Sequence, residues 1–486
     1  MEQINRPTEG QAAAAPRKEW PVGRRERRLL PLSLALGYLM ASLLLGCVNG
    51  WPGLGITALV AGWYAALFLY RGTGGMERRV NRLLLAAVAL LALTFALYSN
   101  LWFRSWNLEA LILLVAVHTW ELCGGGHLPW YRAKMLLERL ALLLQGPFVR
   151  LGALWDTVRS LKERKGLGKW LPVLAGVGVS IPVLWLVTAV LMDADAVFAL
   201  VAGDMIRWFD RRFGEVFQRL LLALCAMPFL FSLLYFAAHT ERDRREEQPE
   251  KEREALPCVI LLGTLDGIYL IFLAVQSAAL FGDRSYLQRA GISFAEYARS
   301  GFFQLVGLAG LNVAVVLLVV WLCREDGRLR FLATVLVALT GVLLVSAAWR
   351  MTLYVSAYGL SFKRLLTYWG MVMLGVLLAL TVRKVWRRGF AFFRAAAPIA
   401  LAGWLLLSCC NVDGIVASYN AAQVRSGRLP QSAVDDLLCS AAGYDGLFAL
   451  DGTADPDLLR WKRENAARDC GSWVTWSLSA SLAARK

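Results

Sequence analysis

The chain has 486 residues, of which 58% are hydrophobic and 18% are charged, and its mean hydropathy is +0.51. This composition excludes an ordinary soluble protein, and the recurrence of apolar runs of about 20 residues excludes a single membrane anchor. The net charge of +16 would suit nucleic acid, but the basic residues lie in short loops between apolar runs, as the orientation of membrane spans requires. We therefore expect the lipid bilayer, and no nucleic acid, as a partner.

The apolar runs predict an all-α fold, a polytopic transmembrane helical bundle of about eleven spans. Unbroken apolar sequence of this length satisfies its backbone groups inside a membrane only as helix. The first 28 residues are polar and basic, and we expect them to form a disordered cytoplasmic arm before an uncleaved first span. The predicted spans are residues 29–48, 53–70, 83–103, 107–123, 171–192, 217–239, 257–281, 302–323, 331–349, 365–382 and 395–410.

Lysine and arginine are about three times as numerous in the segments on the same side of the membrane as the N-terminus as in the opposite loops. This bias predicts a multi-pass protein of the bacterial cell membrane, with its N-terminus inside and, after eleven spans, its C-terminus outside. Glycines such as Gly263 and Gly267 are expected to let helices approach closely.

The spans divide the chain into four spans in 29–123, an inner segment at 124–170, seven spans in 171–410 and a tail at 411–486. The inner segment has the pattern of two amphipathic helices whose basic residues meet anionic lipid headgroups; docking on the bundle is the alternative. The tail is expected to be a small helical appendage on the outer face. Cys439 and Cys470 are the only pair placed to bridge there, and free thiols are the alternative.

Asp266 is the most informative polar residue within a predicted span. It lies about 14 Å from the inner end of that span, close to the membrane midplane. An ionised carboxylate at this depth costs several kcal/mol unless it is partnered. Asp266 is therefore either a proton or cation site or a protonated side chain bonded to a neighbouring helix. Gln276 and Asn312 are the other polar candidates within the spans.

A second set of candidates lies in segments predicted to be outside the membrane, where charged and aromatic residues could line a vestibule. The alternatives are that Asp195 caps a short helix, that Glu296 and Arg299 form a surface ion pair, and that Arg350 is an interfacial anchor. The outer candidates are Asp193, Asp195, Glu296, Tyr297, Arg299, Arg350, Tyr354, Asp413 and Asn420, with Lys363 and Arg364 beside them.

The chain contains no phosphate-binding loop, no HExxH pair and no GxSxG elbow, and its three histidines do not have metal-ligand spacing. We therefore assign no catalytic residue, no metal and no cofactor. This argues against a familiar enzyme, although enzymes embedded in the membrane can lack such signatures.

Several motifs together resemble a family of bacterial polytopic membrane proteins, domain-of-unknown-function family 4173 and its relatives. The resemblance covers more than the second half of the chain and implies a polytopic architecture without an established activity. Gln304 stands where the family usually has an acid. The motifs are Asp193–Phe198, Gln276 with Leu280–Gly282, Phe294–Phe303, Trp349–Leu360, Asn411–Asn420 and Trp473–Ser479.

Three functional hypotheses follow. The first is a non-catalytic protein whose outer loops and tail form a binding surface, for envelope sensing or as a subunit that contacts a membrane-protein partner. The second is an ion- or proton-coupled transporter of small solutes that uses Asp266. The third is a membrane-embedded enzyme acting on lipid or glycan precursors.

Overall fold

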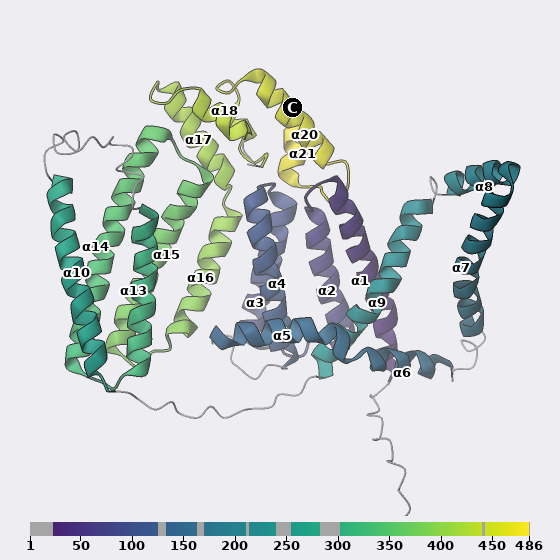
Figure 1. Cartoon of the computed structure of the whole chain (residues 1–486), viewed down its shortest axis with the longest axis horizontal. Coiled ribbons are helices and arrows are strands. Elements are labelled where there is room, and N and C mark those ends of the chain that lie inside the picture. Colours follow the sequence, from purple (N-terminus) through teal and green to yellow (C-terminus); the bar gives the residue numbers. More distant parts are fainter. Residues whose placement is uncertain are drawn as a thin grey trace, which may run out of the picture.

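The computed structural model describes residues 23–124, 133–162, 170–209, 213–239, 254–281, 302–439 and 443–485, and all regular elements in these residues are helices. The all-α prediction is confirmed. Ten described helices are long and apolar enough to cross a membrane (Figure 1). They are α1 (Arg24–Gly46), α2 (Leu54–Arg71), α3 (Arg79–Leu97), α4 (Leu101–Cys123), α9 (Glu215–His239), α10 (Leu256–Phe281), α13 (Phe302–Leu322), α14 (Gly327–Tyr358), α15 (Phe362–Trp386) and α16 (Phe392–Cys409).

Two predicted boundaries are wrong, and both errors have a local cause. The third span does not run to residue 103, because the chain turns at residues 98–100 and α4 begins at Leu101. Asn100 is the N-cap of α4, and its side-chain oxygen accepts a hydrogen bond from the amide of Phe103 at 2.9 Å. The ninth span does not end at residue 349, because Arg350 and Met351 continue the buried stripe of α14.

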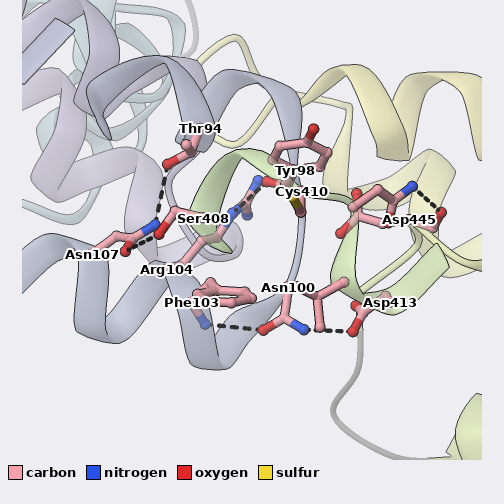
Figure 2. A pocket seen from close by; sticks show the side chains of 12 residues that line it. Thr94, Tyr98, Asn100, Phe103, Arg104, Asn107, Ser408, Cys410, Asp413 and Asp445 are labelled. Carbon is pink, nitrogen blue, oxygen red and sulfur yellow. Dashed lines mark hydrogen bonds between the residues drawn. The ribbon is translucent and has the colours of Figure 1, made fainter. Parts of the chain in front are cut away.

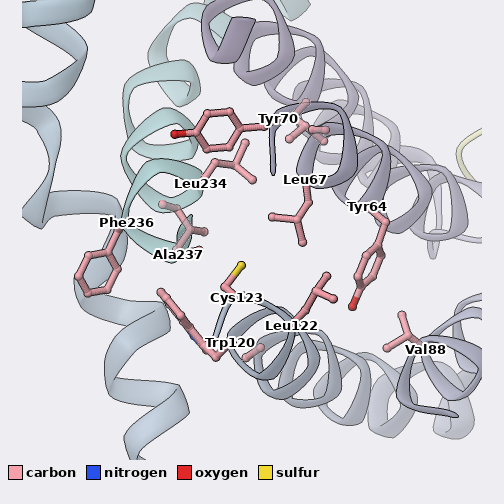
Figure 3. Packing of buried hydrophobic residues seen from close by; sticks show 14 of the residues in the cluster. Tyr64, Leu67, Tyr70, Val88, Trp120, Leu122, Cys123, Leu234, Phe236 and Ala237 are labelled. Carbon is pink, nitrogen blue, oxygen red and sulfur yellow. The ribbon is translucent and has the colours of Figure 1, made fainter. Parts of the chain in front are cut away.

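A first group of helices consists of α1–α4 and α9, with a common core of large apolar side chains (Figure 3). Trp120 of α4 and Leu234 of α9 are both at most 1% exposed in this core. Helices in lipid associate through close packing rather than through a hydrophobic driving force. Gly37 of α1 provides such a contact, because a Cβ there would lie 2.7 Å from the backbone oxygen of Ala223 in α9.

Two helices, α5 (Ala133–Val149) and α6 (Leu151–Lys162), lie across one end of this group and roughly perpendicular to its spans (Figure 1). They pack against α9, with α5 also contacting α4 and α6 also contacting α1. The amide of Arg150 donates to Ser232 of α9 at 3.0 Å, and Ser232 donates to the carbonyl of Gly146 at 2.7 Å. These are the contacts of helices that dock on the bundle, which was the alternative expectation for this segment.

The helices within residues 171–410 do not all pack together. α9 packs on α1, whereas α10 packs on α14 in a second group with α13 and α15. α7 (Trp170–Ala194), a 25-residue helix at the predicted fifth span, contacts mainly α8 (Ala196–Phe209). The α7–α8 pair projects away from the other spans (Figure 1).

The tail contains α17 (Val412–Arg425), α18 (Ser432–Cys439), α19 (Leu447–Leu450), α20 (Pro456–Asp469) and α21 (Leu478–Ala484). It has its own apolar core, in which Val434 and Ala466 are fully buried. The tail lies over the ends of the spans, opposite to α5 and α6 (Figure 1).

The tail is more than an appendage, because it completes the start of α2 after the short 3₁₀ turn at Cys47–Asn49. The amides of Gly53 and Gly55 donate to the carbonyl of Val474 at 2.8 and 3.1 Å, and the amide of Leu54 donates to Trp476 at 2.8 Å. The first amides of a helix have no partner within the helix, so the tail satisfies groups that α2 cannot. Gly53 permits this approach, since a Cβ there would lie 2.1 Å from the oxygen of Trp476.

Candidate functional site

A buried polar site lies where α4 begins, α16 ends and the tail starts (Figure 2). Asn100 is bound on both sides of its amide: while its oxygen caps α4, its nitrogen donates to Oδ1 of Asp413 at 2.7 Å. The other oxygen of Asp413 accepts from the amide of Gly443 at 3.0 Å. One carboxylate on α17 therefore joins the first group of spans to the segment that leads into α19.

Burial changes the acid–base properties of Asp413, which is 8% exposed. Loss of water raises the pKa of its carboxyl from 3.8 to about 6, and the nearby charge of Asp445 adds to the increase. The bonds from Asn100 and Gly443, and the charge of Lys462, act in the opposite direction. Asp413 therefore changes charge near pH 6, whereas an exposed aspartate does so near pH 4.

Asp445 is a second carboxylate of the site and is half-buried. Its two oxygens accept from the amide of Ser99 at 3.2 and 3.1 Å, and the hydroxyl oxygen of Ser99 accepts from the amide of Tyr444 at 2.7 Å. Burial raises the pKa of Asp445. The approach is close, because a Cβ at Gly443 would lie 2.5 Å from Oγ of Ser99. These bonds fix the turn between α3 and α4 against the tail.

Arg104, in the first turn of α4, is 7% exposed. Its guanidinium donates to the carbonyls of Tyr98 at 3.1 Å, Trp51 at 3.2 Å and Phe95 at 3.3 Å. The planar group has five N–H donors in a fixed geometry, which suits several carbonyls around one position. Arg104 therefore links the end of α3 to the turn that precedes α2.

One turn further along α4 than Arg104, Asn107 connects α16 to α3 and α4. Its nitrogen donates to Thr94 at 3.2 Å, and its oxygen accepts from Trp404 at 2.9 Å and from Ser408 at 3.1 Å (Figure 2). Three helices thus meet on one amide, which is 2% exposed. These bonds close the polar site toward the interior of the spans.

A larger cavity of about 290 Å³ adjoins this site and shares Asn100 and Asp413 with it. Its surface is mainly apolar, but two lysines, Lys363 and Lys462, and two aspartates, Asp413 and Asp436, also line it. The ammonium of Lys363 lies 5.4 Å from the ring centre of Trp102, and that of Lys462 lies 5.7 Å from the ring of Tyr444. Burial lowers the pKa of Lys462. Its apolar walls include Phe362, Val416, Ala417, Leu437, Leu438, Leu447 and Leu450.

The profile of one family, Domain of unknown function (DUF4153), matches residues 85–448. The chain belongs to the DUF4153 family. The sequence motifs had indicated domain-of-unknown-function family 4173 and its relatives. The match confirms membership of a domain-of-unknown-function family, and the number of that family is 4153. No curated protein and no solved structure matches this DUF4153 chain. The match and the ten apolar helices identify a multi-pass integral membrane protein. Asn100, Asp413 and Asp445 all lie within the matched residues.

Among the predicted outer candidates of this DUF4153 protein, Asp413 and Asn420 lie at the tail junction. The Asn420 side chain clamps one residue of the α14–α15 turn: its oxygen accepts from the amide of Leu360 at 2.8 Å, and its nitrogen donates to the carbonyl of Leu360 at 2.7 Å. Gly359, with φ of +77°, precedes that residue, and a Cβ there would lie 2.6 Å from the Asn420 oxygen. Two of the motif segments, Trp349–Leu360 and Asn411–Asn420, are therefore in contact.

Arg350 and Tyr354 lie near the same end of α14 but do not line the cavity. Arg350 is 8% exposed, so its side chain packs inside the second group of helices. The guanidinium of Arg364 lies 4.3 Å from the ring centre of Tyr354 and donates to the carbonyls of Tyr358, at 3.0 Å, and Gly359. These contacts close the α14–α15 turn.

Asp193 and Asp195 are distant from these residues, because they lie at the α7–α8 turn (Figure 1). Asp195 accepts from the amide of Phe198 at 2.8 Å and so caps α8. The two aspartates do not form a vestibule with Lys363. Glu296, Tyr297 and Arg299, together with the side chain of Gln276, lie outside the described residues. Cys439 and Cys470 are not bridged.

Sequence reasoning missed Asn100, Arg104, Asp445 and Lys462. A signal was present for the first two: Asn100 directly precedes an apolar run, as an N-cap does, and Arg104 is a charge at the edge of a span. No local pattern marks Asp445 or Lys462, because their partners come from residues far away in the chain.

Proposed function

We propose that this DUF4153 protein is a non-catalytic membrane protein that binds a small ligand between its tail and the outer ends of its spans. The cavity of about 290 Å³ beside Asp413 is the observation that carries the proposal. Its walls come from α4, α15, α17, α18, α19 and α20, so a ligand there contacts the spans and the tail together. Such a site is suited to sensing in the cell envelope or to assembly with a membrane-protein partner.

The cavity chemistry supports an amphiphilic ligand with an acidic group. Its volume accommodates about ten groups of the size of a water molecule, at about 30 Å³ each. Apolar walls favour a short hydrocarbon chain, and Lys363 and Lys462 supply positive charge for a carboxylate or phosphate. The two lysines come from α15 and α20, so binding an acid would join these helices.

The distribution of charge supports an outer location for this cavity. The arginine-rich turns, Arg324–Arg330 between α13 and α14 and Arg383–Arg394 between α15 and α16, lie at the end of the spans opposite to the tail (Figure 1). Basic loops remain on the cytoplasmic side of a membrane. With that orientation the N-terminus is inside, α5 and α6 lie at the cytoplasmic surface near anionic lipid headgroups, and the tail faces outward.

Decanoate, with a ten-carbon chain and one carboxylate, is a suitable first probe. We expect the full-length protein in neutral detergent to bind decanoate in isothermal calorimetry more tightly than decylamine, which carries the opposite charge. Lys363→Met and Lys462→Met are each expected to weaken decanoate binding by about tenfold or more, because a charge-assisted hydrogen bond contributes about 1.5–3 kcal/mol.

Lys384→Met is the matched control, since Lys384 lies near the end of α15 and away from the cavity. This variant should bind decanoate as the wild type does. Equal binding of decanoate and decylamine, or lysine variants that bind like the control, would contradict the proposed chemistry. Crosslinking in native membranes tests the assembly role: recovery of the protein alone in repeated experiments would count against it.

A further inference from the structure

Asp266 lies on the only strongly buried stripe described for α10. Leu262, Asp266 and Tyr269 follow one another at i, i+4 and i+7, and they are 0%, 4% and 5% exposed. The outward side chains of the same helix, such as Ile260 at 62% and Ile271 at 68%, face the surroundings of the protein. α10 is thus a peripheral helix that turns one acidic residue toward α13 and α14.

Both carboxylate oxygens of Asp266 are buried, and neither has a hydrogen-bond partner among the described residues. The side chains of Tyr269, Asn312 and Thr340 form a row of hydrogen bonds that does not include Asp266. Tyr269 donates to the oxygen of Asn312 on α13 at 2.9 Å, and the nitrogen of Asn312 donates to Thr340 on α14 at 2.9 Å. Thr340 in turn donates to the carbonyl of Leu336 at 2.6 Å. This row is complete in itself and supplies no donor to Asp266.

No described cation compensates a charge on Asp266. α13 has no ionisable side chain, and Cys258 and Tyr269 are the other ionisable groups of α10. On α14, Arg330 forms an ion pair with Glu325 at 3.9 Å, and Arg350 lies 20 residues further along the helix. The other titratable groups of α14 are Arg328, beside Arg330 at one end, and Tyr354 and Tyr358 at the other. The packed arrangement therefore fits the neutral, protonated form of Asp266.

We infer that Asp266 is a proton-binding site in the membrane-spanning part of the second helix group, whose protonated form allows α10 to pack on α14. A carboxyl group kept only for structure would hold its proton in a hydrogen bond to a neighbouring helix, and Asp266 makes none. Loss of the proton leaves a charge that this packing cannot hold. Water or a cation must then reach Asp266, or α10 must move away.

The glycines of α10 are consistent with such movement. A Cβ at Gly267 would meet no atom within 4 Å, and one at Gly263 would meet only Leu332, at 3.8 Å. The close helix contacts expected at these glycines are therefore absent. By contrast, α1 and α9 are in close contact in the first group, because a Cβ at Gly37 would lie 2.7 Å from the backbone oxygen of Ala223. This proton site is separate from the tail cavity and does not depend on the ligand proposed there.

Labelling with dicyclohexylcarbodiimide tests the inference, because this apolar reagent reaches acids within a membrane. The carboxyl proton moves to a carbodiimide nitrogen while the carboxyl oxygen attacks the central carbon, and acyl transfer to nitrogen then gives a stable N-acylurea. We expect full-length protein in lipid vesicles to be labelled at Asp266, as located by peptide mass spectrometry. Labelling should fall about tenfold for each pH unit above the midpoint of proton release.

Variants separate proton binding from a general change of structure. Asp266→Asn should abolish the label, whereas Tyr269→Phe, which removes the hydroxyl bonded to Asn312, should retain it. Asp326, which caps α14 and accepts from the amide of Arg328 at 2.7 Å, should remain unlabelled as a hydrogen-bonded acid of the same helix group. Labelling of Asp266 that does not change between pH 5 and 10 would show a permanently neutral, structural acid and would overturn the inference.

Infrared spectroscopy covers the case in which the reagent does not reach Asp266. A protonated carboxyl has a carbonyl stretching band that an ionised carboxylate lacks, and Asp266→Asn identifies the band. We expect the wild-type band to disappear as the pH rises. If the spectra show no titrating band assigned to Asp266, the inference is wrong whatever the labelling result.

Discussion

Asp413→Asn is the most informative change at the tail junction, because it removes a buried charge and preserves the shape of the side chain. In the folded protein the pKa of Asp413 is about 6, compared with 3.8 for an ordinary aspartate. The folded tail therefore binds this proton more tightly than the unfolded chain, and stability falls as the pH rises from about 4 to about 6. A difference of about two pKa units corresponds to about 3 kcal/mol.

Hydrogen exchange measured by mass spectrometry on peptides that include Gly443 reports this loss of stability directly, since the amide of Gly443 donates to Asp413. After correction for intrinsic exchange, the wild-type opening free energy should fall by about 3 kcal/mol between pH 4 and pH 7. The Asp413→Asn protein lacks the contribution of this carboxyl, so its fall between pH 4 and pH 7 should be smaller by about 3 kcal/mol. Asparagine has one acceptor oxygen for the two donors, Asn100 and Gly443, so we also expect a pH-independent loss of about 1–3 kcal/mol.

The difference between the two proteins isolates Asp413, because Asp445 and Lys462 are present in both. Glu464→Gln, which changes an exposed carboxylate on α20 that lines neither the polar site nor the cavity, is the control and should follow the wild type at every pH. Parallel curves for wild type and Asp413→Asn would refute the reasoning, because burial of this carboxyl would then have no energetic consequence.

Two further substitutions test how the tail is attached. Gly53→Ala places a Cβ about 2 Å from the oxygen of Trp476 and should destabilise tail docking by about 1–3 kcal/mol, seen as faster exchange in residues 472–478, whereas Gly74→Ala, which meets no atom, should not. Asn420→Ala leaves both backbone groups of Leu360 without their partner, and protection of that amide should fall by about 2 kcal/mol. Unchanged exchange in either case would show that these contacts do not hold the tail.

Sequence patterns were sufficient for the spans, because a membrane imposes a strong and local requirement. Twenty apolar residues in a row have few alternatives to a spanning helix, so the predicted runs correspond to observed helices. The errors arose at the ends of the apolar runs, where the membrane no longer dictates the structure. The turn at residues 98–100 lies between two apolar runs, and only the capping preference of Asn100 marks it. Arg350 was placed at an interface by its charge, although its side chain is buried in α14.

The candidate site was less predictable, because its contacts join residues far apart in the chain. Asp413 and Asn420 were identified from their motif, but Asn100 is 313 residues from Asp413, and the periodicity of one segment carries no information about a partner at that distance. The same reason explains why the tail was expected to be an appendage. Nothing near Val474 or Trp476 in the sequence indicates that their carbonyls complete α2.

The pairing of residues 53–55 with residues 474–476 also affects the order in which the protein can mature. A ribosome makes the start of α2 long before it makes Val474, so the early helices must wait in the membrane with their first amides unsatisfied by the chain. A stop codon upstream of Val474 would then harm the beginning of the molecule as well as its end. Translation of these late residues is the step at which the first spans acquire their finished form.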